Sequence, residues 1–182
     1  MRMFPMNQKT KRLAYCAMAI ALATVASFIK VFEFPTGGSI TLFSMLFIAL
    51  VGYWYGPATG IITGIAYGLL QLIIKPEIYY PAQVVLDYVC AFGALGFSGF
   101  LKDKKHGLLL GYIAAITGRW IFASLSGAIF FGEYAWKGWN PYAYSLAYNG
   151  IYIGAEAAVT IVLISIPPVK KALEFVKQKA IS

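Results

Sequence analysis

Charge is scarce in this sequence. Charged residues make up 12% of its 182 positions, about half the fraction of an average soluble domain. Hydrophobic residues make up 60% and aromatic residues 16%. These charged residues are too few for the surface of an ordinary water-soluble protein. We therefore expect most of the chain's surface to face lipid.

Residues for metal, nucleophilic and phosphate chemistry are also rare. The single histidine, His106, lies in a predicted loop, and Cys16 and Cys90 lie inside apolar runs. No cluster has the spacing of metal ligands, and no histidine inside the membrane could activate Ser126 as a nucleophile. No Walker A sequence is present, so the chain is not expected to hydrolyse ATP. We therefore expect no catalytic residue, no metal and no cofactor, and the chain is predicted not to be an enzyme.

Six apolar runs follow one another along the chain, and a membrane-spanning helix needs about 20 such residues. The runs are residues 13–32, 40–55, 58–74, 82–101, 107–131 and 142–166. Pro167 and Pro168 end the last run, and a short basic amphipathic tail follows. We predict an all-α, polytopic membrane protein with six transmembrane helices, forming one domain over residues 1–182. The first run is interpreted as a retained span rather than a cleaved signal peptide.

Basic residues are concentrated on one side of these spans, although the net charge is +8. Eleven of them lie before the first span, between the fourth and fifth, and after the sixth: Arg2, Lys9, Lys11, Arg12, Lys102, Lys104, Lys105, Lys170, Lys171, Lys177 and Lys179. The other side has Lys30, Lys75 and Lys137. The positive-inside rule therefore places both termini in the cytoplasm. No basic stripe runs along a helix, so nucleic acid is not an expected partner.

Small residues recur every fourth position in two places. Glycines do so across the second and third runs, at Gly52, Gly56, Gly60, Gly64 and Gly68. Such spacing lets helices approach closely, so we predict tight internal packing, with a functional hinge as the alternative. In the first run, Ala17 and Ala21 share this spacing, as do Ala19 and Ala23. These alanines serve either internal packing or the docking of a partner subunit.

Three ionisable residues lie inside predicted spans, and such residues are costly there and therefore functional candidates. They are Asp87, Arg119 and Glu156. At about 1.5 Å per residue, Asp87 lies roughly 8 Å and Asn149 roughly 10 Å below the outer ends of their spans. Aromatic residues lie at or above that depth: Tyr88, Phe131, Tyr144 and Tyr148. This pattern favours a flat, cationic organic ligand, while an internal Asp–Arg or Glu–Arg pair that only fixes helix packing is the alternative.

The outer loops are rich in aromatic residues. Residues 133–144 contain Trp136 and Trp139, and residues 75–81 contain Tyr79 and Tyr80. Such residues form either a belt at the membrane interface or a lid over a binding site. Composition favours neither interpretation.

Two long stretches, residues 79–100 and 126–156, resemble the thiamine-specific substrate-binding subunit (S component) of energy-coupling factor transporters. Residues 35–46 share the resemblance less distinctively. It implies a six-helix subunit in the plasma membrane of a prokaryote that binds thiamine near its outer face. It also implies partners, namely a transmembrane coupling subunit and two ATPase subunits.

The resemblance further implies ligand-binding residues on the fourth, fifth and sixth helices: Asp87, Tyr88, Arg119, Gly127, Phe131, Tyr144 and Asn149. It implies a docking face for the coupling subunit at Ala17 and Ala21. The sequence also departs from the family. Some members have tryptophan, glutamate and histidine where Gly38, Leu42 and Ala123 stand here. Some have glutamate for Asp87 and tryptophan for Phe131.

A different class of function is the alternative. The chain would then be a stand-alone, ion-coupled secondary transporter or channel for a small organic cation. Asp87, Arg119 and Glu156 would form its proton or ion relay. Uptake by the chain alone, without ATPase partners, would distinguish this class.

Overall fold

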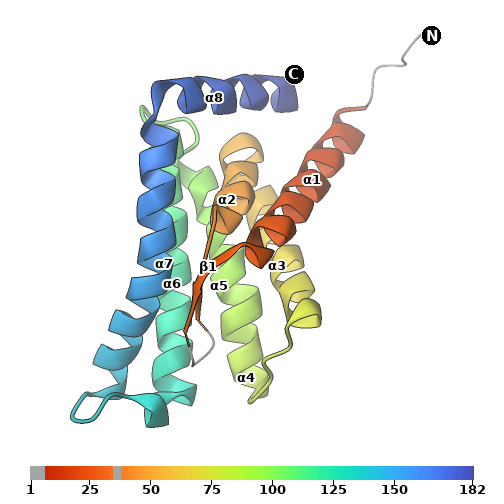
Figure 1. Ribbon diagram of the computed structural model, residues 1–182. Helices are drawn as coiled ribbons and strands as arrows, with labels where there is room; N and C mark the ends of the chain where they lie inside the picture. Colours follow the sequence, from red (N-terminus) through yellow and green to blue (C-terminus); the bar gives the residue numbers. More distant parts are fainter. Residues whose placement is uncertain (1–6, 35–37) are drawn as a thin grey trace.

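The computed structural model describes residues 7–34 and 38–182, as a bundle of helices with one small hairpin (Figure 1). Arg2 and the first three residues of the stretch 35–46 lie outside the described residues. The helices are α1 (Gln8–Phe28), α2 (Ser44–Tyr55), α3 (Pro57–Ile74), α6 (Gly107–Phe130), α7 (Pro141–Ser165) and α8 (Pro167–Ile181). A further continuous helix, Pro81–Leu101, is divided into α4 (Pro81–Val84), a π-helical turn (Val85–Cys90), α5 (Ala91–Gly93) and a 3₁₀ segment (Ala94–Leu101). A 3₁₀ turn (Gly132–Tyr134) follows α6.

Five described helices are long and apolar enough to cross a membrane: α1, α3, Pro81–Leu101, α6 and α7. The all-α membrane class is confirmed, but the predicted second span is a shorter helix. With 12 residues, α2 extends about 18 Å, less than the hydrocarbon thickness of about 30 Å. It packs against α1, α3, α6 and the Ala94–Leu101 segment, and Ile48 and Val51 are fully buried. Its uniform hydrophobicity reflects a position in the protein core.

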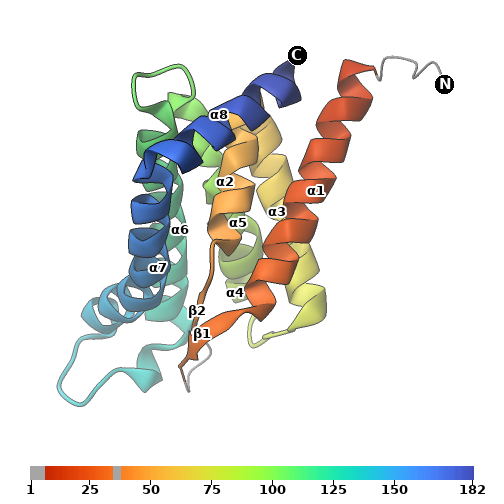
Figure 2. The same ribbon diagram turned by 45° about the horizontal axis from the view of Figure 1, so that its top comes forward.

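A β-hairpin joins α1 to α2, and it corrects the predicted limits of the first two spans. Strand β1 (Lys30–Glu33) pairs antiparallel with β2 (Ser39–Thr41), with Lys30 opposite Thr41 and Glu33 opposite Ser39. The expected helices 13–32 and 40–55 therefore end at Phe28 and begin at Ser44. Apolar residues such as Val31 and Phe32 suit a strand as well as a span, so hydropathy did not mark the boundary. Figure 2 shows the hairpin running toward the end of the bundle opposite α8.

The glycine stripe packs three helices closely, α2, α3 and Pro81–Leu101, as predicted. A Cβ on Gly60 would lie 2.6 Å from the Gly52 Cα atom, and one on Gly64 or Gly68 would meet the backbone of the Pro81–Leu101 helix. Gly56 differs, because its φ of 93° makes the break between α2 and α3 and nothing lies within 4 Å of its added Cβ. The stripe is thus occupied by internal contacts.

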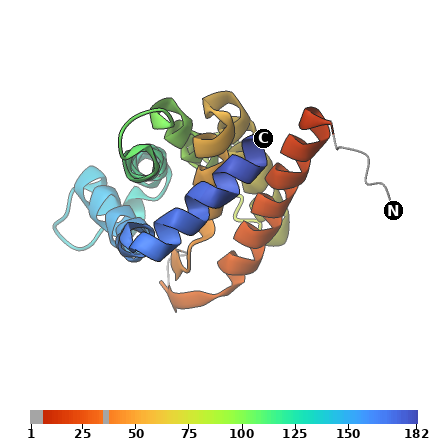
Figure 3. The same ribbon diagram turned by 90° about the horizontal axis from the view of Figure 1, so that it is seen from above.

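Helix α8 lies across one end of the bundle, from α7 toward α1 (Figure 3). The Tyr53 hydroxyl donates to Glu174 Oε1 at 2.6 Å, and the Tyr55 hydroxyl donates to the Ala180 carbonyl at 3.0 Å. Lys11 Nζ lies 3.3 Å from Ser182 Oγ, so the start of α1 and the end of the chain are neighbours. This agrees with two termini on one side of a membrane, while their cytoplasmic location stays a prediction.

The two pairs of alanines on α1 face opposite ways. Ala19 and Ala23 are buried against the bundle, so the internal-packing interpretation holds for them. Ala17 and Ala21 are exposed beside the exposed Leu22. This separation leaves a small-residue stripe on the outer surface of α1.

Candidate ligand-binding cavity

A cavity with a volume of about 850 Å³ is lined by residues of the β1–β2 hairpin and of the segment between α3 and α4. In Figure 1 these elements lie toward the end of the bundle opposite α8. The volume is within the usual range for small-molecule sites, about 300–1,000 Å³. All seven ligand-binding residues implied by the resemblance line it: Asp87, Tyr88, Arg119, Gly127, Phe131, Tyr144 and Asn149. Gly38 and Ala123 line it as well, whereas Leu42 is not among the lining residues. The fold thus brings together residues far apart in the sequence.

Asp87 is presented to this cavity by the π-helical turn and held by a buried glutamine. Gln83 Nε2 donates to Asp87 Oδ2 at 2.7 Å and to the Glu77 carbonyl at 3.2 Å, while Gln83 Oε1 accepts from the Tyr79 amide at 3.2 Å. Gln83 is 1% exposed, and its spacing of four residues from Asp87 is the sequence signal that could have identified it. The glutamine orients one carboxylate oxygen, and Asp87 has further acceptor capacity.

Tyr88 holds the segment that follows α3. Its hydroxyl donates to the Lys75 carbonyl at 3.1 Å and accepts from the Glu77 amide at 3.2 Å. The ring stacks on Phe92, with centroids 6.4 Å apart. The only hydroxyl proton of Tyr88 is therefore used within the protein, which leaves its ring and one acceptor lone pair for a ligand.

Arg119 lies in the cavity wall, and no acidic side chain among the described residues pairs with it. Its guanidinium carbon is 4.0 Å from the centroid of the Phe92 ring. Its Nε and Nη1 atoms are buried and have no hydrogen-bond partner within the described ranges 7–34 and 38–182. Across residues 7–34 and 38–182, no carboxylate lies within 4.0 Å of its nitrogens, so the alternative interpretation, an internal Asp–Arg or Glu–Arg pair, is not supported. Buried donors without partners are costly, so these atoms favour an acceptor on a ligand.

Glu156 has a structural role at the start of α2. Its carboxylate accepts hydrogen bonds from Thr41 Oγ1 at 2.6 Å, Ser44 Oγ at 3.1 Å and the Met45 amide at 3.1 Å. The residue is 4% exposed, and an anion is stabilised at a helix N-terminus by the helix dipole. Glu156 therefore joins α7 to the junction of β2 and α2, although it also lines the cavity.

A row of tyrosines and Asn149 forms the α7 wall. The Tyr144 and Tyr148 rings stack at 5.6 Å, and the Tyr148 hydroxyl accepts from the Gly38 amide at 3.0 Å. The Tyr152 hydroxyl donates to Asn149 Oδ1 at 2.6 Å, and Asn149 Nδ2 donates to the Ser145 carbonyl at 2.9 Å. Sequence reasoning did not single out Tyr152, although its spacing continues that of the other two tyrosines.

Aromatic residues of both outer loops reach the cavity. Phe131, at the end of α6, contacts Tyr79 edge to face with centroids 5.3 Å apart. Trp136 contacts Tyr144 in the same way at 5.2 Å. Tyr79 and Tyr134 line the cavity. The rings at this rim extend the site outward, which favours the lid interpretation over a belt alone.

The charges of the lining nearly balance. It contains four carboxylates and three cationic side chains, which leaves one formal negative charge in excess: Glu33, Glu77, Asp87 and Glu156 against Lys30, Lys75 and Arg119. Hydrogen bonds from Lys30 and Lys75 lower the pKa of the exposed Glu33 below its ordinary 4.5. Burial disfavours the charged form of Lys75, but hydrogen bonds to Glu33 and Glu77 outweigh it and raise its pKa above 10.5. These two groups are thus charged at neutral pH.

Apolar helices around a polar, aromatic cavity define a small-molecule-binding membrane protein of several spans. The family model described as Thiamine transporter protein (Thia_YuaJ) matches residues 13–176, and the chain belongs to this family.

The thiamine transporter ThiT of Bacillus subtilis is 32% identical, over 81% of this chain and 86% of the relative. ThiT of Lacticaseibacillus paracasei is 26% identical, over 87% and 89%. The solved structure of ThiT from Listeria monocytogenes has the same fold, with a TM-score of 0.73, 23% identity, and coverage of 89% of this chain and 97% of that one. The predicted family is therefore confirmed, as is the location in the bacterial plasma membrane.

Proposed function

We propose that this protein captures thiamine from outside the cell in the cavity lined by Asp87, Arg119, Phe131 and Asn149. The observation that carries the proposal is that residues of three separate helices meet at one cavity with aromatic walls. Its relatives are named thiamine transporters. Thiamine is a monocation with two flat heteroaromatic rings, and the lining has one formal negative charge in excess.

The geometry suggests a distinct role for each group. Phe131 and the neighbouring rings offer faces to the two heteroaromatic rings of thiamine, and aromatic faces attract a ring cation. Asp87, oriented by Gln83, accepts from the amino group of the pyrimidine. The buried Arg119 nitrogens donate to a ring nitrogen or the hydroxyl of the ligand. Pairing these polar groups removes the cost of leaving them buried and unsatisfied.

The proposal includes partners, because one chain with no Walker A sequence does not supply ATP hydrolysis. Ala17 and Ala21 form an exposed small-residue stripe on α1. Such a stripe lets another transmembrane helix approach closely. We therefore assign it to a transmembrane coupling subunit, which in turn would work with two ATPase subunits.

Calorimetric titration of the purified protein with thiamine tests the substrate. We expect saturable binding at micromolar ligand or below, and no binding of choline, a cation without heteroaromatic rings. Absence of heat with thiamine would reject the assignment. Mass spectrometry of a ligand retained through purification provides an independent check.

The alternative, a stand-alone ion-coupled transporter, needs a relay through Asp87, Arg119 and Glu156. Glu156 is occupied by three donors at the start of α2. No ion pair joins Arg119 to either carboxylate among the described residues. Proteoliposomes that contain this chain alone should therefore bind thiamine without accumulating it. Accumulation driven by an ion gradient would establish the alternative.

A further inference from the structure

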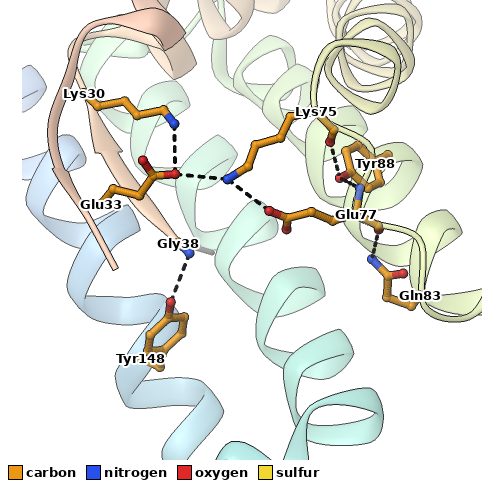
Figure 4. Close-up of polar contacts among 8 residues, drawn as sticks. All are labelled: Lys30, Glu33, Gly38, Lys75, Glu77, Gln83, Tyr88 and Tyr148. Atoms are coloured by element: carbon orange, nitrogen blue, oxygen red, sulfur yellow. Dashed lines mark hydrogen bonds and ion pairs between the residues drawn. The ribbon is translucent and has the colours of Figure 1, made fainter. Parts of the chain in front are cut away.

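The β1–β2 hairpin is fastened to the segment after α3 by a bridge of four charged residues, which we name the Lys75 bridge (Figure 4). Lys75 Nζ lies 3.1 Å from Glu33 Oε1 and 3.1 Å from Glu77 Oε1. Lys30 Nζ lies 2.9 Å from the same Glu33 oxygen. All four residues line the cavity. The bridge therefore joins two separate parts of the cavity wall.

One side of the bridge is held firmly. The Lys75 amide donates to the Gln71 carbonyl at 2.9 Å, which closes the end of α3. Tyr88 and Gln83 bind the backbone of Lys75 and Glu77 from the neighbouring helix (Figure 4). The lysine thus projects from a segment whose backbone is fixed by buried side chains.

The hairpin is anchored where β2 meets α2, because Thr41 donates to Glu156 at 2.6 Å, but β1 is held loosely. All four residues of β1 are exposed. Beyond the bridge, this part of the hairpin is tied to α7 by the Gly38–Tyr148 hydrogen bond at 3.0 Å and by the contact of the Phe34 and Tyr148 rings at 5.5 Å. A two-stranded ribbon is only marginally stable alone, so such ties decide its position.

We propose that Lys75 is a positioning residue for ligand retention: its ammonium holds the hairpin against the cavity mouth and slows dissociation of the bound molecule. This rests on the proposed function as far as the ligand is concerned. The bridging side chains are 35–49% exposed, so their attraction is screened by salt. Hairpin opening is therefore expected to depend on ionic strength.

The first test is the dissociation rate of labelled thiamine, chased with unlabelled thiamine at about 0.01 M and about 1 M salt, where the Debye length falls from about 30 Å to about 3 Å. For the unmodified protein we expect dissociation to accelerate about two- to fivefold with salt, the size that partly exposed ion pairs support. From the Lys75→Met variant, thiamine should dissociate at the fast rate at both salt concentrations.

Lys137→Met is the matched control, because Lys137 is an exposed lysine of an outer loop and is not among the residues that line the cavity. It should keep both the slow rate and the salt dependence. An unchanged slow rate and salt dependence in Lys75→Met, or their loss in the control, would overturn the proposal.

A second test needs no ligand. With Cys16 and Cys90 replaced by alanine, Ala123→Cys places one thiol in the cavity lining. A water-soluble maleimide should label it about two- to fivefold faster after Lys75→Met or in high salt. Equal labelling would reject the Lys75 bridge even if thiamine binds. Faster labelling without any thiamine binding would retain the bridge and reject the proposed ligand.

Discussion

At the scale of single residues, Asp87 is the cavity carboxylate that we propose binds the ligand. It lies in a π-helical turn, a local geometry that is frequent at functional sites. Gln83 fixes one of its carboxylate oxygens. Glu156 lines the same cavity, but its hydrogen bonds go to the start of α2. The hydrogen-bond partners of Asp87 and Glu156 therefore differ. Those of Glu156 fix the start of α2, while Asp87 keeps acceptor capacity toward the cavity.

Asp87→Asn keeps the shape of the side chain and removes its charge. We expect thiamine affinity to fall about 10- to 100-fold, because a hydrogen bond to a charged group contributes about 1.5–3 kcal/mol. Titration calorimetry measures the change. Gln83→Met, which removes the orienting donor and leaves the carboxylate, should weaken binding less. Unchanged affinity in Asp87→Asn would exclude that residue from the site.

The Lys75 bridge also predicts a pH dependence for ligand retention. The pKa of Glu33 is lowered from 4.5, so its pairing is complete above that value and is lost as pH falls through the lowered pKa. The pKa of Lys75 is raised above 10.5, so its charge is lost only in stronger alkali. Dissociation of thiamine should be constant from about pH 6 to about pH 9 and faster in acid. In Glu33→Gln it should already be fast at neutral pH, which separates this effect from titration of Asp87.

At the scale of elements, glycines set the distance between α3 and the Pro81–Leu101 helix. A Cβ on Gly64 would meet the Phe92 carbonyl group, which is backbone and cannot rotate away. The Pro81–Leu101 helix also carries Gln83, Asp87 and Tyr88. Close helix packing therefore determines the position of one wall of the cavity.

Gly64→Ala should destabilise the protein by about 1–3 kcal/mol, the usual cost of overpacking a close contact. Thermal unfolding in detergent, followed by tryptophan fluorescence, should show a lower midpoint. Gly154→Ala is the matched control, because nothing lies within 4 Å of its added Cβ. This control should be neutral or slightly stabilising, since alanine favours a helix over glycine. Equal midpoints for the two variants would contradict the packing role.

At the scale of the whole molecule, the proposed ligand cavity and the proposed docking stripe lie on different parts of the protein. The cavity lies toward the end of the bundle opposite α8, and the Ala17–Ala21 stripe lies on the outer face of α1. The inner alanines of the same helix, Ala19 and Ala23, are buried. A substitution on the outer stripe should therefore affect partner docking without changing the fold or the cavity.

Ala17→Leu should leave thiamine affinity of the isolated chain unchanged and reduce ATP-dependent uptake by the assembled transporter at least about tenfold, because a bulky side chain prevents close helix approach. Calorimetry and uptake into proteoliposomes measure the two effects. Ala158→Leu, an equally small and exposed position on α7, should retain uptake. Normal uptake by Ala17→Leu would remove the stripe from the docking surface.

The sequence alone determined the membrane class, the family and the long helices, because long apolar runs and continuous motifs are local properties. It also named seven residues that the fold brings to one cavity; their contact with thiamine stays a prediction. Only the tertiary structure decided that residues 30–33 and 39–41 form a hairpin and that α2 is a buried core helix. It alone showed that Arg119 pairs with no carboxylate in the part of the chain that the structure describes. The tertiary structure alone also identified Gln83 as the partner of Asp87 and revealed the Lys75 bridge. The reason is physical. Strand pairing, ion pairing and burial depend on which segments contact each other in space, and hydropathy along the chain does not specify those contacts.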